Sequence, residues 1–120
     1  MAPDDIHELF CVFGPVEVRR MFGAAGIFVD GLMIALVSDG VIYLKADEES
    51  AESFEREGLG PFSYRRKGKR AELPYRRMPD RLYDDPDELA VWARAALAAA
   101  QRNGIGKAAA KREAKRARKS

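Results

Sequence analysis

Residues 27–45, IFVDGLMIALVSDGVIYLK, decide the fold of this chain of 120 residues. Three apolar runs, rich in β-branched side chains, are separated by two short pairs, Asp30-Gly31 and Asp39-Gly40. An Asp-Gly pair suits the type I′ turn of a two-residue hairpin, because both central residues of that turn need a positive φ. Two such turns nine residues apart predict a β-meander of antiparallel strands.

The stretch before the meander, residues 16–22, partly alternates and predicts one more strand. Two glycines follow it, Gly23 and Gly26, and a phosphate-binding loop is one interpretation of them. Such a loop points N–H groups from a helix start at an anion, whereas Gly26 leads into a strand. We therefore interpret the glycines as a bulge or tight bend. Arg19 and Arg20 point to opposite faces of the predicted strand. We expect one of them to form a structural ion pair with an acid of the meander rather than to contact a ligand.

Two helices are predicted on either side of the meander. The first covers residues 5–13, with Asp5 as the expected N-cap and Glu8 as its capping-box partner. It carries one apolar stripe at helical spacing, made of Ile6, Leu9, Phe10 and Phe13. Asp47 opens the second helix, over residues 48–57.

A second hairpin follows the second helix. Residues 62–66 alternate between polar and apolar, residues 67–69 provide a turn, and residues 70–77 return as a strand. Pro74 interrupts the returning strand with a residue that has no N–H group. We therefore expect that strand at an edge of the sheet.

The last helix begins at Asp85-Pro86, which provides a cap, a proline at the first helical position and acids in the first turn. Its expected end is Asn103-Gly104. Residues 107–120 then contain no large apolar side chain, so we expect a disordered tail or a fluctuating helix. The prediction is an α+β domain over residues 1–104, in the order α-βββ(β)-α-ββ-α, followed by a basic flexible tail over residues 105–120.

The net charge of +2 hides a division between these two parts. Seven of the 21 Lys and Arg residues, but one of the 19 acids, follow residue 106, which gives the tail a charge of +6. Residues 1–106 carry the other 14 bases and 18 acids, a charge of −4. This asymmetry indicates an interaction tail.

The sequence offers little material for catalysis or metal binding. His7 and Cys11, four residues apart, are the single histidine and the single cysteine, and a metal site needs three or four ligands. The carboxylates concentrate in turns and helix starts, and no nucleophile elbow or Walker A pattern is present. We therefore predict no enzyme, no metal and no cofactor. The acidic N-terminus and the short apolar runs predict a cytoplasmic protein without a membrane partner.

Residues 18–47 resemble the N-terminal domain of the bacterial TfoX/Sxy family. The resemblance covers roughly residues 5–103 and ends in a helix that begins with Asp-Pro. The matching residues are Arg19, Arg20, Met21, Phe22, Gly23, Gly26, Gly31, Leu32, Tyr43, Leu44, Lys45, Asp47, Phe62, Tyr64, Tyr75, Pro79 and Trp92. The resemblance implies one curved antiparallel sheet flanked by helices. It also implies transcriptional co-regulation of natural competence, and no catalysis. Longer family members carry a second helical domain, where this chain has its basic tail.

The first functional hypothesis is a co-regulator that contacts nucleic acid without reading its sequence. The tail would make that contact by releasing counterions from phosphates. Its basic residues are Lys107, Lys111, Arg112, Lys115, Arg116, Arg118 and Lys119. A second basic set surrounds the predicted hairpin turn and consists of Arg65, Arg66, Lys67, Lys69 and Arg70. For the hairpin we favour protection of a strand edge from aggregation over nucleic-acid contact.

The second hypothesis is a protein-interaction module that binds a transcription factor or RNA polymerase, or forms a homodimer, without direct DNA binding. Val91, Ala95 and Ala98 form an apolar strip beside the buried stripe of the last helix, and such strips can be interfaces. Helix propensity explains the alanines equally well. The two hypotheses differ in salt dependence, because only phosphate binding weakens steeply with salt.

Overall fold

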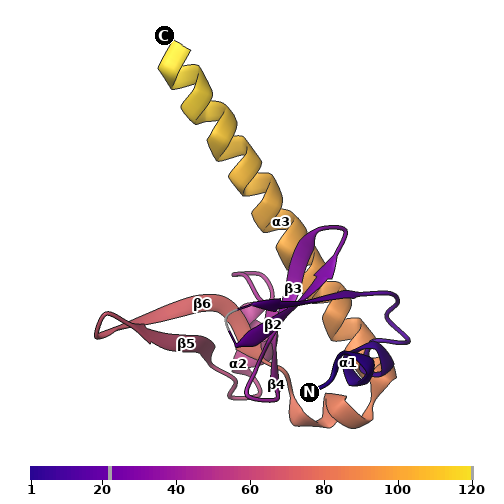
Figure 1. Cartoon of the computed structure of the whole chain (residues 1–120). Helices are drawn as coiled ribbons and strands as arrows, with labels where there is room; N and C mark the ends of the chain where they lie inside the picture. Colours follow the sequence, from indigo (N-terminus) through magenta and orange to yellow (C-terminus); the bar gives the residue numbers. More distant parts are fainter. Residues whose placement is uncertain (22, 120) are drawn as a thin grey trace.

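A computed structural model describes the backbone of residues 1–21 and 23–119, and their side chains except those of residues 66 and 105–119. The order of elements confirms the α+β prediction (Figure 1). The strands are β1 (Glu17–Met21), β2 (Ala24–Val29), β3 (Leu32–Ser38), β4 (Val41–Lys45), β5 (Pro61–Arg66) and β6 (Lys69–Arg77). The helices are α1 (Pro3–Leu9), α2 (Ala51–Glu55), the 3-10 helix η1 (Asp80–Asp84) and α3 (Pro86–Lys119).

All six strands form one antiparallel sheet in the order β1-β2-β3-β4-β6-β5. Both Asp-Gly turns of the meander have the backbone that the sequence predicts. Asp30 and Gly31 have φ values of 50° and 78°, and Asp39 and Gly40 have 51° and 74°. The meander is therefore set by local turn chemistry.

The edge position predicted for the strand that contains Pro74 is wrong. That strand, β6, lies between β4 and β5, and β5 forms the edge. Its pairing with β5 shifts between Pro61 and Phe62, so Pro74 falls where the ladder is interrupted. The missing N–H of Pro74 therefore costs no ladder bond, and its carbonyl still accepts a bond of 2.9 Å from the N–H of Ala46.

The first two helices begin and end differently from the prediction. Helix α1 begins at Pro3, because proline suits the first helical position, so Asp5 is not the N-cap. The Asp5 carboxylate instead accepts a bond of 3.3 Å from the N–H of Ala2. Helix α2 is shorter than predicted, and Asp47 accepts a bond of 3.1 Å from the N–H of Ser50 just before it.

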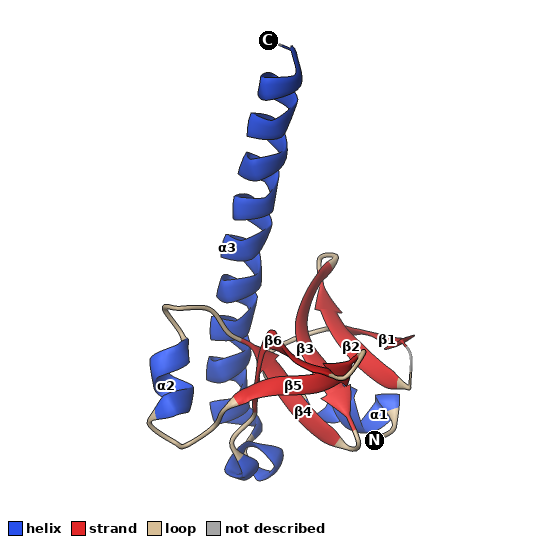
Figure 2. Cartoon of the chain, turned by 90° about the vertical axis from the view of Figure 1, so that its left-hand side faces the viewer, coloured by secondary structure: helices blue, strands red, loops and turns tan. Residues whose placement is uncertain are grey.

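Helix α3 begins as predicted, with the Asp85 carboxylate accepting a bond of 3.0 Å from the N–H of Glu88. Its predicted end at Asn103-Gly104 is wrong, because the helical backbone continues to Lys119 (Figure 2). A glycine inside a helix costs only about 1 kcal/mol, and the alanines, lysines and arginines that follow are strong helix formers. The boundary at residue 104 and the flexibility of residues 105–120 stay predictions.

The sheet has a core face and an outer face. On the core face, paired residues such as Val37 and Ile42, or Ala35 and Leu44, pack against all the helices. The helices contribute Ile6, Phe10, Phe54, Leu82, Leu89, Ala93, Ala96 and Ala100 to this core. We call the opposite side of the sheet, where Leu36 pairs with Tyr43, the outer face.

Candidate nucleic-acid interface

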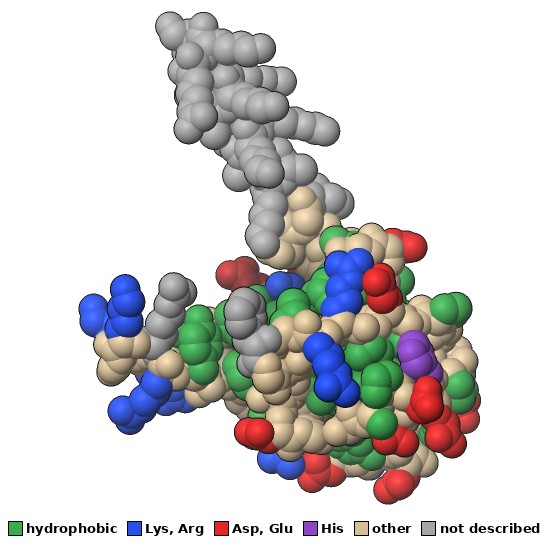
Figure 3. All heavy atoms as spheres, in the orientation of Figure 1, with side chains coloured by type: hydrophobic (Ala, Val, Ile, Leu, Met, Phe, Trp, Pro, Cys, Tyr) green, Lys and Arg blue, Asp and Glu red, His purple; other side chains and the backbone are tan. Residues whose placement is uncertain are grey.

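The β5–β6 hairpin carries the second predicted basic set away from the body of the molecule (Figure 1). Lys67 and Gly68 form its turn, with φ values of 51° and 77°, so the predicted turn is confirmed. Figure 3 shows Lys and Arg side chains gathered at the end of this hairpin. The hairpin therefore presents its charges on a projection rather than on a packed surface.

Four of the five hairpin cations have no ion-pair partner among the described side chains. Arg65, Lys67, Lys69 and Arg70 are exposed. Among the side chains that the structure describes, none of these four takes part in an ion pair. Arg65 lies directly opposite Arg70, and like charges in that position destabilise a hairpin. The side chain of Arg66 lies outside the described residues. This arrangement suits an external anion better than it suits the hairpin itself.

The first predicted basic set, that of the tail, lies on the C-terminal part of α3. The backbone positions of Lys107, Lys111, Arg112, Lys115, Arg116, Arg118 and Lys119 are helical, and their side chains lie outside the described residues. Figure 1 shows that this part of α3 and the β5–β6 hairpin leave the body in different directions. The structure thus places the two basic sets on two separate projections.

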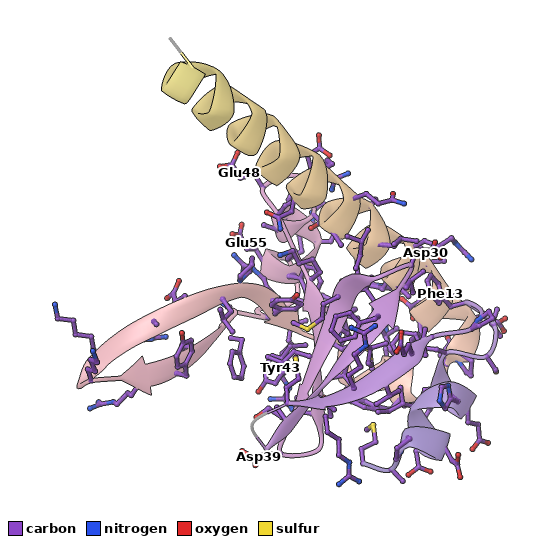
Figure 4. The ribbon with its side chains drawn as sticks, turned by 45° about the horizontal axis from the view of Figure 1, so that its top comes forward. Phe13, Asp30, Asp39, Tyr43, Glu48 and Glu55 are labelled. Carbon is purple, nitrogen blue, oxygen red and sulfur yellow. The ribbon has the colours of Figure 1, made fainter. Side chains whose placement is uncertain are left out.

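An acidic groove lies between α2 and β6. It encloses about 630 Å³ and is lined by Asp47, Glu48, Glu52, Glu55 and Glu72, among others. Figure 4 labels Glu48 and Glu55 near α2, away from the end of the hairpin. The lining also contains Arg76, but its five carboxylates make the groove an unfavourable place for an anion.

Three aromatic residues that sequence reasoning left out of the site lie together on the outer face. The rings of Tyr43 and Phe62 meet edge to face, with centroids 4.8 Å apart, and those of Phe62 and Tyr64 are 6.4 Å apart at an angle of 29°. The alternation of Phe62 and Tyr64 on one strand was a visible signal. Tyr43 comes from a distant strand, and only the sheet order brings it to them.

A model of the TfoX N-terminal domain matches residues 8–100, which are most of the chain and include all six strands of its sheet. The chain belongs to the TfoX N-terminal domain family. This TfoX domain is also 32% identical over 77 residues to Protein Sxy of Escherichia coli (strain K12). The match takes in 64% of this chain and 37% of Sxy, so the chain spans well under half the length of that relative.

Within this TfoX domain, the arginine-glycine stretch 19–26 is part of the sheet. Arg19 pairs with Glu17 at 3.0 Å and lies over the ring of Phe28, 4.6 Å from its centroid. One of the two arginines thus forms an ion pair, as expected, but its partner is an acid of the same strand, β1, rather than an acid of the meander. Gly23, with a φ of 78°, lies between the paired ends of β1 and β2, so the predicted tight bend is confirmed there. Gly26 lies inside β2 instead.

The remaining candidates of this TfoX domain are the histidine and the cysteine. Both His7 and Cys11 are exposed. The described residues contain no group of three or more His, Cys, Asp or Glu that could hold a metal ion. In the same part of the chain, no helix combines the length and the apolar character needed to span a bilayer.

Proposed function

We propose that this TfoX-family protein is a non-catalytic, cytoplasmic co-regulator of transcription, related to competence regulators, that its basic residues hold on nucleic acid. The proposal rests on four exposed hairpin cations, Arg65, Lys67, Lys69 and Arg70, beside a mildly acidic body. Within the described part of the chain, none of the four forms an ion pair. The tail contributes seven basic residues and the hairpin five. Such contacts bind phosphates by counterion release and read no base sequence.

The test uses two full-length charge variants and a random-sequence duplex. In the tail variant, all seven basic residues from Lys107 to Lys119 become Gln, and in the hairpin variant Arg65, Lys67, Lys69 and Arg70 become Gln. Fluorescence anisotropy over a range of salt concentrations gives the slope of log K against log salt. Each lost phosphate contact is expected to make that slope about 0.9 less negative.

The tail variant is expected to lose most of its duplex affinity, and the hairpin variant a smaller part. Equal affinities for the parent and both variants would disprove the proposal. A control variant, Arg94→Gln, removes one exposed arginine from α3 outside both basic sets and is expected to leave binding unchanged.

A protein-interaction module without direct DNA binding is the second candidate. Val91 is 58% exposed, and Ala95 lies exposed one turn further along α3. This strip would contact a transcription factor, RNA polymerase or a second copy of the chain. Val91→Glu is expected to abolish such an interaction, measured as dimer formation by analytical ultracentrifugation or as retention of purified RNA polymerase. An apolar contact would also persist at salt concentrations that release nucleic acid.

A further inference from the structure

The outer face beside the basic hairpin contains an accessible aromatic surface. Tyr64 is 38% exposed, although the structure buries most of its other large apolar side chains. It lies on β5, the edge strand, paired with the small residue Ala71. Its ring therefore has little packing from the neighbouring strand and is open to a ligand.

The ring of Tyr64 is held in place by a short chain of aromatic contacts. Phe62 lies two residues before it on the same face and packs edge to face on Tyr43 of β4. Figure 4 places Tyr43 where the hairpin leaves the meander. The half-buried Phe62 thus anchors the hairpin, and Tyr64 extends the aromatic surface toward solvent.

Positive charge lies close to this surface. Lys69 lies on the outer face with Tyr64, because it pairs with residue 66, two residues after Tyr64 on β5. Lys67 lies in the turn, three residues from Tyr64, a distance of about 10 Å along an extended strand. Arg65 and its cross-strand partner Arg70 lie on the opposite face of the hairpin. A ligand with a flat apolar group and adjacent negative charges matches both features at once.

We propose that the outer face binds single-stranded nucleic acid, with a base stacked on Tyr64 and the neighbouring phosphates contacted by the hairpin cations. The inference extends the proposed function, and it names a second contact that is independent of the tail. A duplex hides the flat surfaces of its bases within its own stack, so this surface favours single strands. The unpaired cations favour a polyanion over an apolar protein partner.

The experiment compares Tyr64→Ser, Tyr64→Phe and the parent in the full-length tail variant described above, so that the tail does not mask the hairpin. The probes are fluorescein-labelled oligothymidylate and oligouridylate of roughly 12 nucleotides, within the usual site sizes. A duplex of equal length is the third probe. Val12→Ala, a change to another exposed apolar residue, which follows α1 and belongs to none of the proposed contact surfaces, is the matched control. Circular dichroism melts show that each variant is folded.

Tyr64→Ser is expected to weaken binding of the single strands about tenfold or more, because one stacked base is lost. Tyr64→Phe keeps the ring and should retain most of the affinity, while Val12→Ala should change nothing. Ultraviolet cross-linking of the oligonucleotides should mark Tyr64. The comparison of oligothymidylate with oligouridylate shows which of the two single strands binds better.

Unchanged affinity of Tyr64→Ser would overturn the inference, as would equal binding of the duplex and the single strands. Absence of single-strand binding at low salt would overturn it too, and would make the outer face a candidate for a protein partner. Failure of the proposed function is a separate outcome. In that case removal of the tail and hairpin charges would not change duplex binding, and the Tyr64 variants would still show whether the outer face binds single strands.

Discussion

Arg102 of α3 makes two hydrogen bonds with the carboxylate of Asp47, from Nε to Oδ2 at 2.6 Å and from Nη2 to Oδ1 at 3.0 Å, although 55 residues separate them. A further ion pair of 3.0 Å joins Arg102 to Glu49. These contacts tie the long helix to the segment between β4 and α2. Arg102 lies little more than one helical turn before Lys107, the first basic residue of the tail.

The contact with Arg102 makes stability depend on pH in the acid range. The hydrogen bonds from Arg102 hold the pKa of Asp47 at about 2, below its ordinary value of 3.8. Because the folded pKa is lowered, this stabilisation is complete above pH 3.8 and is lost as the pH falls toward 2. Solvent screening of a partly exposed pair leaves about 1 kcal/mol. Urea unfolding of Asp47→Asn is expected to show that loss at pH 6, and little difference from the parent near pH 2.

Replacement of Gly26 by alanine, which adds only a methyl group, is predicted to destabilise the fold. A Cβ there would lie 2.7 Å from Cε2 of Phe28 and 2.8 Å from Sδ of Met33. The methionine can move, but the Phe28 ring must shift away from Arg19, so Gly26→Ala is expected to destabilise the fold by about 1 kcal/mol. Gly60→Ala is the control, because nothing lies within 4 Å of its Cβ position. Equal thermal melting of the two variants would contradict the prediction.

Tyr83 completes a backbone hydrogen bond that the sheet leaves open. The N–H of Ile42, in the core of β4, donates to the hydroxyl oxygen of Tyr83 at 2.9 Å. Tyr83→Phe leaves a buried N–H without a partner and should cost about 1–3 kcal/mol. Hydrogen exchange at the Ile42 amide should become faster in the variant. Unchanged exchange there would mean that water or another group replaces the hydroxyl.

The Tyr75 hydroxyl is predicted to ionise at a higher pH than an ordinary tyrosine. Burial raises its pKa to about 12 from an ordinary 10.0, and its hydroxyl donates to the carbonyl of Met33 at 3.3 Å. A raised folded pKa means that this stabilisation is present below pH 10 and is lost as the pH rises toward 12. An absorbance titration of tyrosinate should show a step near pH 12 that Tyr75→Phe removes. If the step remains in that variant, it belongs to another residue.

Local chemistry was enough to predict the meander, the second hairpin and the start of the last helix. Asp30-Gly31 and Asp39-Gly40 need no distant contact to form their turns, because the positive φ values are favoured by the residues themselves. The cap at Asp85 likewise acts within three residues. The strands within residues 18–47, the stretch that resembles the TfoX/Sxy family, were predicted from the same turn signals and from the pattern of apolar residues between them.

Long-range packing decided the features that the residues alone left open. The place of β6 inside the sheet, the aromatic surface of Tyr43, Phe62 and Tyr64, and the contact of Arg102 with Asp47 all join segments far apart in the chain. A strand pairs with whichever neighbour buries its core face, and no local propensity encodes that choice. The wrongly predicted end of α3 has a local cause instead, because Gly104 and Gly106 oppose the helix only weakly against the many alanines, lysines and arginines around them.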